Sequence, residues 1–143
     1  MIVYCAGAIR GDTKYRKSLL EIIDYVKILG HTALSEFNES FKVSVPLTDK
    51  EIYKRDIKWL ERSQLVIADV SGTSTGVGFE ISYALFKLQK PVLAIANDKS
   101  DSVSALIKGC NSILLTYKNY SDYEELKKII SSFINKFNTS SEK

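Results

Sequence analysis

The sequence predicts a doubly wound α/β fold, flavodoxin-like or Rossmann-like, in which helices cover both faces of a five-stranded parallel sheet. Short apolar runs rich in β-branched residues alternate with longer segments of helical periodicity, and these runs are apolar almost throughout, as in strands buried on both faces. The 143 residues, 45% hydrophobic and 26% charged, have the length and composition of one globular domain. We expect this domain to cover residues 1–137, with a flexible polar tail over 138–143.

The first half of the chain is predicted to hold two strands and two helices. A buried strand over 2–6 ends at Gly7. Asp12 is placed to cap the next helix, which Gly30 ends. The remaining elements are a weak strand over 32–35, an irregular loop over 37–46 and a helix from Thr48 or Asp49 to about Ser63.

The second half continues the alternation of strands and helices. Its clearest element is the apolar strand over 65–70, which a hydroxyl-rich loop follows. The predicted elements after that loop are a helix through Leu88, strands over 92–96 and 112–116, a short helix over 103–108 between them, and a terminal amphipathic helix over 120–137.

The predicted fold also says where a ligand would bind. In doubly wound sheets ligands lie beyond the carboxyl ends of the strands, at the point where the strand order reverses. With the order 2-1-3-4-5 this point falls between the first and third strands. The loops after Ala6 and after Val70 should therefore carry the unusual residues of the chain.

Charge, cysteine and histidine content exclude several classes of protein. A net charge of +3 is too small to indicate binding to a nucleic-acid polymer, and no run of 18 apolar residues predicts a membrane span. The start of the chain lacks the basic segment of a secretion signal. Cys5 and Cys110 do not make a disulfide framework, and His31 has no neighbour at metal-ligand spacing. We therefore expect a cytoplasmic, metal-free protein.

The loop after the first strand, over 7–11, combines two glycines with an arginine at the start of a helix. Gly7 and Gly11 would let backbone N–H groups approach a ligand, and the Arg10 guanidinium matches the geometry of a phosphate. The alternative interpretation is a tight turn with an exposed arginine.

The loop after the third strand leads to Glu80, which is expected in the first turn of a helix. The sequence here is not a phosphate-binding Walker loop, and Ile81 stands where a dinucleotide fingerprint needs its third glycine. The helix dipole would favour the ionised carboxylate, which can act as a nucleophile. The alternative is an ordinary acidic residue at a helix start.

Two further residues are candidates for the same site. Asp56 shares a helical stripe with large apolar side chains, where a carboxylate needs partners and its pKa rises. Two carboxyl groups in different environments can divide the roles of nucleophile and acid/base. Tyr4 lies near the end of the first strand, where its hydroxyl can reach a carboxylate. The alternatives are a boundary aspartate paired with a basic residue and a tyrosine of the core.

A second possible anion site is the hydroxyl-rich helix start around Ser104. Its alternative interpretation is ordinary N-capping of that helix.

Five segments of the chain, taken in order, resemble a known family. They are 4–11 (Tyr-Cys-Ala-Gly-Ala-Ile-Arg-Gly), 56–60 (Asp-Ile-Lys-Trp-Leu), 66–70 (Val-Ile-Ala-Asp-Val), 76–80 (Gly-Val-Gly-Phe-Glu) and 104–109 (Ser-Ala-Leu-Ile-Lys-Gly). Together they resemble the 2'-deoxynucleoside 5'-phosphate N-hydrolases, of the nucleoside 2-deoxyribosyltransferase superfamily. The resemblance covers about residues 2–117.

This resemblance implies a role for each candidate. Glu80 would attack C1' of a deoxyribonucleotide, Asp56 would help with proton transfer and hold the sugar, and Tyr4 would orient the nucleophile. Ser104 would come from the neighbouring subunit of a homodimer. The implied substrate-binding residues, most of them around the phosphate, are Gly7, Ile9, Arg10, Gly11, Ser74, Gly76, Gly78 and Ser104.

The chain departs from the family pattern at two positions. Ala8 replaces a serine of the first loop and so removes one hydroxyl from the phosphate pocket. Phe37 stands where the family has an active-site histidine, allowing a one-residue gap. These departures concern substrate affinity and base preference more than the reaction.

The function implied is hydrolysis of deoxynucleoside monophosphates to a free base and 2-deoxyribose 5-phosphate through a covalent glycosyl-glutamate, without metal or organic cofactor. Arg10 and the Ser104 segment favour this reading over a transferase that exchanges bases on unphosphorylated nucleosides. Hydrolysis of ribonucleotides such as CMP, and a nucleotide-binding sensor without turnover, stay open as alternatives.

Overall fold

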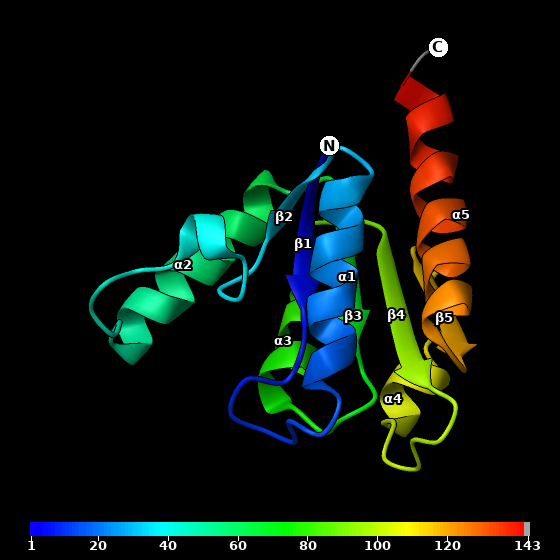
Figure 1. Cartoon of the computed structure of the whole chain (residues 1–143), viewed down its shortest axis with the longest axis horizontal. Coiled ribbons are helices and arrows are strands. Elements are labelled where there is room, and N and C mark those ends of the chain that lie inside the picture. Colours follow the sequence, from blue (N-terminus) through cyan, green and yellow to red (C-terminus); the bar gives the residue numbers. More distant parts are fainter. Residues whose placement is uncertain (142–143) are drawn as a thin grey trace.

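A central parallel sheet organises the protein, shown in Figure 1 as a computed structural model that describes the backbone of residues 1–141 and the side chains of residues 1–138. Every neighbouring pair of strands is parallel, and the strand order is β2-β1-β3-β4-β5. The predicted doubly wound sheet is therefore confirmed, with the reversal between β1 and β3. The strands are β1 (Ile2–Ala6), β2 (Thr32–Leu34), β3 (Leu65–Asp69), β4 (Val92–Asn97) and β5 (Leu115–Tyr120).

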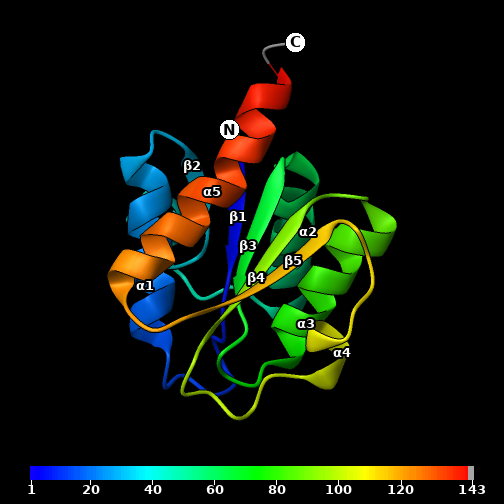
Figure 2. The ribbon, with the colours of Figure 1, turned by 90° about the vertical axis from the view of Figure 1, so that its right-hand side faces the viewer.

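Helices cover both faces of this sheet (Figure 2). One face carries α1 (Arg16–Ile28) and α5 (Tyr123–Ser141), which pack on each other. The opposite face carries α2 (Asp49–Arg62), α3 (Thr75–Ser82) and the short α4 (Ala105–Lys108). The predicted helix through Leu88 is a continuous segment in which α3 passes into a π-helical turn, η2 (Tyr83–Lys87).

The strands divide their side chains between two hydrophobic cores, because successive residues of a strand point to opposite faces. In β1, Val3 and Cys5 join the core under α1 and α5. Tyr4 and Ala6 join the core under α2 and α3. This alternation places the Tyr4 side chain on the face that also carries the two candidate acids.

Local sequence signals explain where α2 begins and where α1 ends. Thr48 and Glu51 form a reciprocal capping box, in which Thr48 Oγ1 accepts from Glu51 N at 3.2 Å and Glu51 Oε1 accepts from Thr48 N at 3.0 Å. Gly30, which follows α1, has a φ of +88°, a conformation that glycine adopts without steric cost. Both predicted boundaries are confirmed.

The expected cap of α1 is wrong. The helix begins at Arg16, and no side chain caps it. Asp12 instead accepts from the backbone N–H of Lys14 at 3.0 Å, while its own backbone N–H donates to the Thr73 carbonyl at 3.0 Å. This residue therefore ties the loops after β1 and β3 together rather than starting a helix.

Three other boundaries differ from prediction. The loop over 37–46 contains a short 3₁₀ helix, η1 (Glu39–Phe41), for which Asn38 accepts from Ser40 N. The last strand begins at Leu115 instead of 112, because Ser112 holds a turn by accepting from Leu114 N. Helix α5 starts at Tyr123, since Tyr120 still belongs to β5, and it continues through Ser141. Residues 142–143 of the predicted tail lie outside the described residues.

Cys5 and His31, for which no chemistry was predicted, make contacts within the fold. Cys5 is buried in the core, and burial raises the pKa of its thiol to about 12. His31 Nδ1 lies 2.9 Å from the terminal amino group of Met1. In the described part of the chain, no helix has both the length and the apolar character of a membrane span.

Candidate active site

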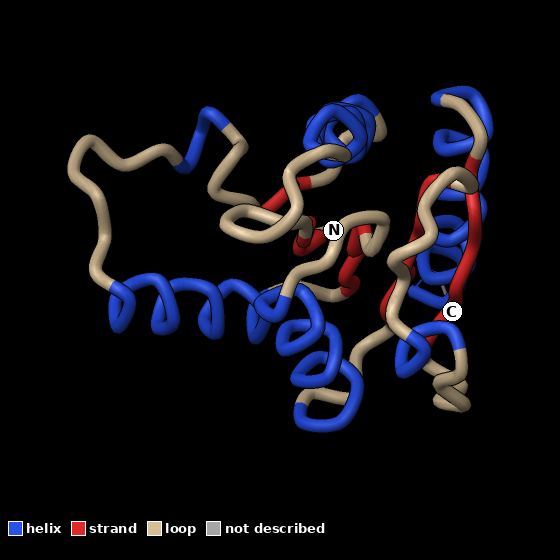
Figure 3. The backbone as a smooth tube through the Cα atoms, turned by 90° about the horizontal axis from the view of Figure 1, so that it is seen from below, coloured by secondary structure: helices blue, strands red, loops and turns tan. Residues whose placement is uncertain are grey.

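A cavity of about 530 Å³ opens at the carboxyl edge of the sheet, at the reversal between β1 and β3. Figure 3 views the molecule from this edge. Its wall is formed by the β1–α1 loop, one side of α2 and the start of α3. The predicted site residues that line it are Gly7, Ile9, Arg10, Gly11, Asp56, Ser74, Gly76 and Glu80.

Glu80 and Asp56 therefore converge on one cavity although they lie on different helices. Asp56 is carried by the middle of α2 and Glu80 by α3. A carboxylate pair at the carboxyl edge of a sheet can supply both a nucleophile and a proton donor to a substrate held between them.

The environment of Glu80 differs from the prediction. Ser74 accepts from the backbone of Val77 at 3.3 Å and caps α3, so the helix starts earlier than expected and Glu80 lies in its second turn. The helix dipole acts mainly over the first turn, and burial controls this group instead. Burial raises the pKa of Glu80 to about 7, with Asp56 and Glu36 contributing in the same direction.

Tyr4 is the buried partner of Glu80. Its side chain is 4% exposed, and its hydroxyl forms a hydrogen bond with the Glu80 carboxyl, which partly offsets the effect of burial on the pKa of Glu80. Burial and the two nearby carboxylates raise the pKa of Tyr4 well above its usual value, so the phenol stays a neutral donor. The structure thus unites the two interpretations of Tyr4: it is a core residue that also reaches the site.

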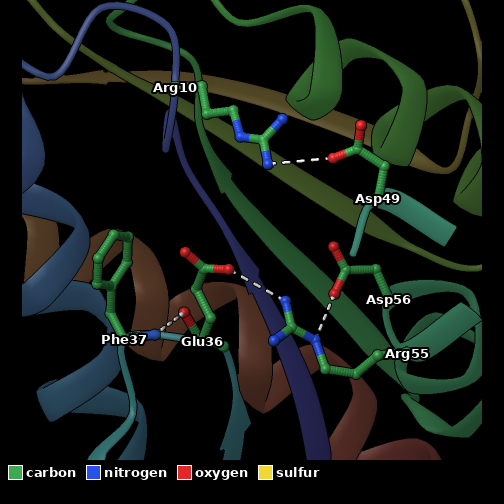
Figure 4. Close-up of polar contacts among 7 residues, drawn as sticks. Arg10, Glu36, Phe37, Asp49, Arg55 and Asp56 are labelled. Carbon is green, nitrogen blue, oxygen red and sulfur yellow. Dashed lines mark hydrogen bonds and ion pairs between the residues drawn. The ribbon is translucent and has the colours of Figure 1, made fainter. Parts of the chain in front are cut away.

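Asp56 likewise satisfies both of its interpretations. It faces the cavity, and its Oδ1 accepts from Arg55 Nε at 3.0 Å. Burial raises the pKa of Asp56, and the Arg55 guanidinium partly offsets that rise. Arg55 Nη2 also donates to Glu36 Oε2 at 3.1 Å, as Figure 4 shows.

Neither Arg55 nor Glu36 was recognised as a site residue from the sequence. Neighbours on a helix point about 100° apart, so adjacency to Asp56 did not indicate contact. The partner Glu36 is 19 residues away and follows β2. The only sequence signal was an arginine beside an aspartate on a predicted buried face.

Arg10 lies at the mouth of the cavity. Its Nη2 is 3.2 Å from Asp49 Oδ1, and both side chains are mostly exposed. An exposed ion pair of this kind contributes about 0–1 kcal/mol and is easily exchanged for another anion. Its position fits the predicted phosphate contact.

The glycines of the first loop serve packing as well as access. A Cβ on Gly11 would lie 2.3 Å from the Thr73 carbonyl oxygen, and one on Gly7 would lie 2.6 Å from Leu19 Cδ2. Gly11 is therefore required for the close approach of the two loops. By contrast, a Cβ on Gly76 would lie 3.9 Å from Glu80 Oε1, within the cavity.

Several expected residues do not line this cavity. Gly78 and Ser104 line a second cavity, of about 780 Å³, between α3 and α4. The Phe37 ring packs toward α1, where Arg16 Cζ lies 4.8 Å from its centre. Ala8 lies outside the lining too. The phenylalanine at the family's histidine position therefore contributes to the core beneath α1 rather than to the cavity.

Two exposed aromatic residues complete the mouth of the cavity. Tyr53 and Phe79 both line it, with their ring centres 6.2 Å apart and their planes at 65°. Neither was predicted from the sequence to be a site residue. No group of three or more His, Cys, Asp or Glu side chains suited to a metal ion occurs within the described residues.

Comparisons with known proteins place this geometry in context. Residues 3–136 match the family model described as nucleoside 2-deoxyribosyltransferase. A protein of Thermofilum pendens named as a 2'-deoxynucleoside 5'-phosphate N-hydrolase is 35% identical over 133 residues, which are 87% of this chain and 89% of the relative. A protein of the same name from Methanosarcina mazei is 36% identical over 135 residues, covering 92% of this chain and 83% of the relative.

Among solved structures, the CMP N-glycosidase of Clostridium botulinum has a TM-score of 0.68 at 18% identity, covering 92% of this chain and 98% of that chain. The fold and the cavity define a flavodoxin-like α/β protein with a carboxylate pair where its strand order reverses. By its sequence, the chain belongs to the nucleoside 2-deoxyribosyltransferase family. The resemblance found in the sequence is confirmed.

Proposed function

We propose that the protein hydrolyses the N-glycosidic bond of 2'-deoxynucleoside 5'-monophosphates, releasing the free base and 2-deoxyribose 5-phosphate. The observation that carries this proposal is the meeting of Glu80 and Asp56 in one cavity, with Arg10 at its mouth. The names of the relatives from Thermofilum pendens and Methanosarcina mazei support the same reaction and substrate class.

The reaction would proceed in two steps. In the first, Glu80 is ionised and Asp56 is protonated: the Glu80 carboxylate attacks C1', the bond from C1' to the base nitrogen breaks, and the base leaves with the electron pair and takes the proton of Asp56. In the second, water attacks C1' as Asp56 takes a proton from it, and the Glu80 carboxylate is released. Developing positive charge on the sugar is stabilised by the carboxylates.

The hydroxyl of Tyr4 would direct the Glu80 carboxyl toward C1'. Because the pKa of Glu80 is raised to about 7 and the ionised form is the nucleophile, activity would rise with pH through neutrality. Phosphate bound by Arg10 would supply binding energy remote from the reacting carbon.

Incubating the protein separately with dGMP and deoxyguanosine, and then measuring free guanine, tests this function. We expect guanine from dGMP without a second base. Release only from deoxyguanosine, or only when an acceptor base is added, would indicate a transferase instead. A parallel incubation with GMP reports the sugar preference, and nucleotide binding with no release from any substrate would indicate a sensor.

Replacing Arg10 by alanine is expected to lower kcat/KM for dGMP about 10- to 100-fold, mainly through KM, because a charge-assisted bond to the phosphate is lost. Asp49→Asn is expected to have the opposite sign, lowering KM a few-fold, since it frees the Arg10 guanidinium and removes a negative charge from the cavity mouth. Steady-state kinetics on dGMP measure both. A lower KM for Arg10→Ala would contradict the phosphate assignment.

We further propose that a second copy of the chain covers the cavity between α3 and α4, as a homodimer in which Ser104 reaches the partner's site. Apolar side chains line that cavity, among them Leu106 at 85% exposure and Phe86 at 67%. Exposed apolar residues gathered at one surface are typical of an interface.

The substitution Leu106→Asp should weaken association at least about 10-fold, because it places a charge in the apolar contact. Sedimentation velocity across a concentration series measures this effect. Leu20→Asp, at an exposed leucine on the opposite face of the sheet, is the matched control. A wild-type protein that sediments as a monomer at all concentrations contradicts the dimer.

A further inference from the structure

Arg55 is held on three sides beside the cavity of the candidate active site. Its guanidinium bridges Asp56 at 3.0 Å and Glu36 at 3.1 Å, and its Cζ lies 4.6 Å from the centre of the Trp59 ring. The side chains of Arg55, Asp56 and Glu36 are 17%, 20% and 26% exposed. A guanidinium fixed by two carboxylates and an aromatic face has little rotational freedom, unlike the exposed Arg10 pair.

The charge balance around this group is unusual. Four carboxyl groups line the cavity. Asp49 pairs with Arg10 at the mouth, and the other three, those of Glu36, Asp56 and Glu80, each come from a different segment of the chain. Among the ion pairs of the described side chains, Arg55 supplies the only cation that contacts any of the three. Like charges in a partly buried site oppose one another's ionisation unless a counter-charge is present.

We propose that Arg55 is a positioning residue, which fixes the Asp56 carboxylate in the cleft and supplies the counter-charge that allows Glu80 to ionise beside it. Glu36 also accepts from the Arg55 guanidinium, and its negative charge partly cancels the positive charge that Arg55 presents to Glu80. The inference rests on the proposed hydrolase function and deepens it, because it assigns the acid–base balance of the site to a residue that takes no part in the two proposed steps.

Four side chains act on the ionisation of the Glu80 carboxyl. Tyr4 contacts it from β1, Asp56 and Arg55 act on it from α2, and Glu36 acts from the segment after β2. Asp56 and Glu36 raise the pKa of Glu80, whereas Arg55 and the Tyr4 hydrogen bond lower it. Removing Arg55 must therefore move the ionisation of Glu80 to higher pH, and removing the charge of Glu36 must move it to lower pH.

Three variants test these opposite shifts: Arg55→Gln, Arg55→Lys and Glu36→Gln. The readouts are kcat, KM and the acidic limb of the pH profile of kcat/KM on dGMP. Arg55→Gln should lower kcat about 10- to 100-fold through misplacement of Asp56, with little change in KM, and should move the acidic limb up by about 0.5 to 1 unit. Arg55→Lys should keep the limb near its wild-type position but recover kcat only in part, because an ammonium lacks the fork geometry.

Glu36→Gln preserves an acceptor for Arg55 and should move the limb down by a similar amount. The matched control is Arg62→Gln, an exposed arginine at the end of the same helix, which should leave the profile unchanged. An unmoved limb in Arg55→Gln, or shifts of the same sign in Arg55→Gln and Glu36→Gln, overturns the proposal. If Arg55→Gln fails to fold by circular dichroism, an unmoved limb in Glu36→Gln is decisive against it.

The wild-type measurement separates this inference from the function on which it rests. A wild-type protein that releases no base from any nucleotide overturns the hydrolase function, and the inference with it. A wild-type protein that hydrolyses dGMP, with variants that leave the acidic limb in place, overturns the role of Arg55 alone.

Discussion

Replacing Glu80 by glutamine is expected to abolish release of guanine from dGMP, with kcat reduced at least about 10³-fold, while nucleotide binding persists. The amide has nearly the shape of the carboxyl group but no nucleophilic oxygen of comparable strength. Rapid-quench measurement of free guanine, together with calorimetric titration of dGMP, separates the two effects. Glu61→Gln, at an exposed glutamate of α2, is the matched control and should retain full activity.

Thermal unfolding measured across pH shows whether the loss of activity in Glu80→Gln comes from unfolding. The pKa of Glu80 in the folded protein is raised to about 7, from a usual value of 4.5. The folded state therefore holds its proton more tightly, and the contribution of Glu80 to stability falls as pH rises from about 4.5 to about 7. Glutamine does not titrate, so the Glu80→Gln variant avoids this loss of stability. Above pH 7 its free energy of unfolding should therefore exceed that of the wild type by up to about 3 kcal/mol. An inactive but less stable variant would not support a catalytic role.

Asp56→Asn is expected to lower kcat on dGMP about 10²- to 10³-fold, because the departing base no longer receives a proton from the enzyme. The loss should shrink on nucleotides whose base is a better leaving group, since such a base needs less protonation. Measuring kcat for the variant and the wild type across a series of bases tests this dependence. Asp24→Asn, at an exposed position of α1, should be neutral.

For Asp56→Asn we also expect a change in the pH dependence of kcat/KM. Asp56 raises the pKa of Glu80, so removing its charge should move the acidic limb of kcat/KM to lower pH. An equal loss on all bases together with an unmoved limb would contradict the acid–base role and leave only a structural one.

The sequence alone was sufficient for the fold and for the location of the cavity that Arg10, Asp56 and Glu80 line. The strands β1, β3 and β4 are buried on both faces, so they appear in the sequence as continuous apolar runs, and their alternation with helices determines a parallel sheet. The loops that follow β1 and β3 then meet where the strand order reverses, and that rule placed Arg10 and Glu80 together. The capping signal at Thr48 also predicted the start of α2, because a cap acts within one turn of the chain.

Tertiary structure alone decided the electrostatics of the site. The pKa of Glu80 depends on burial and on Tyr4, Asp56 and Glu36, which come from three other segments of the chain. The bridge from Arg55 to Glu36 depends on how α2 packs beside the end of β2. Burial and electrostatic interactions depend on distance in space, whereas a sequence pattern reports only separation along the chain. The meeting of Glu80 and Asp56 in one cavity could therefore be predicted, but the balance of charge around them could not.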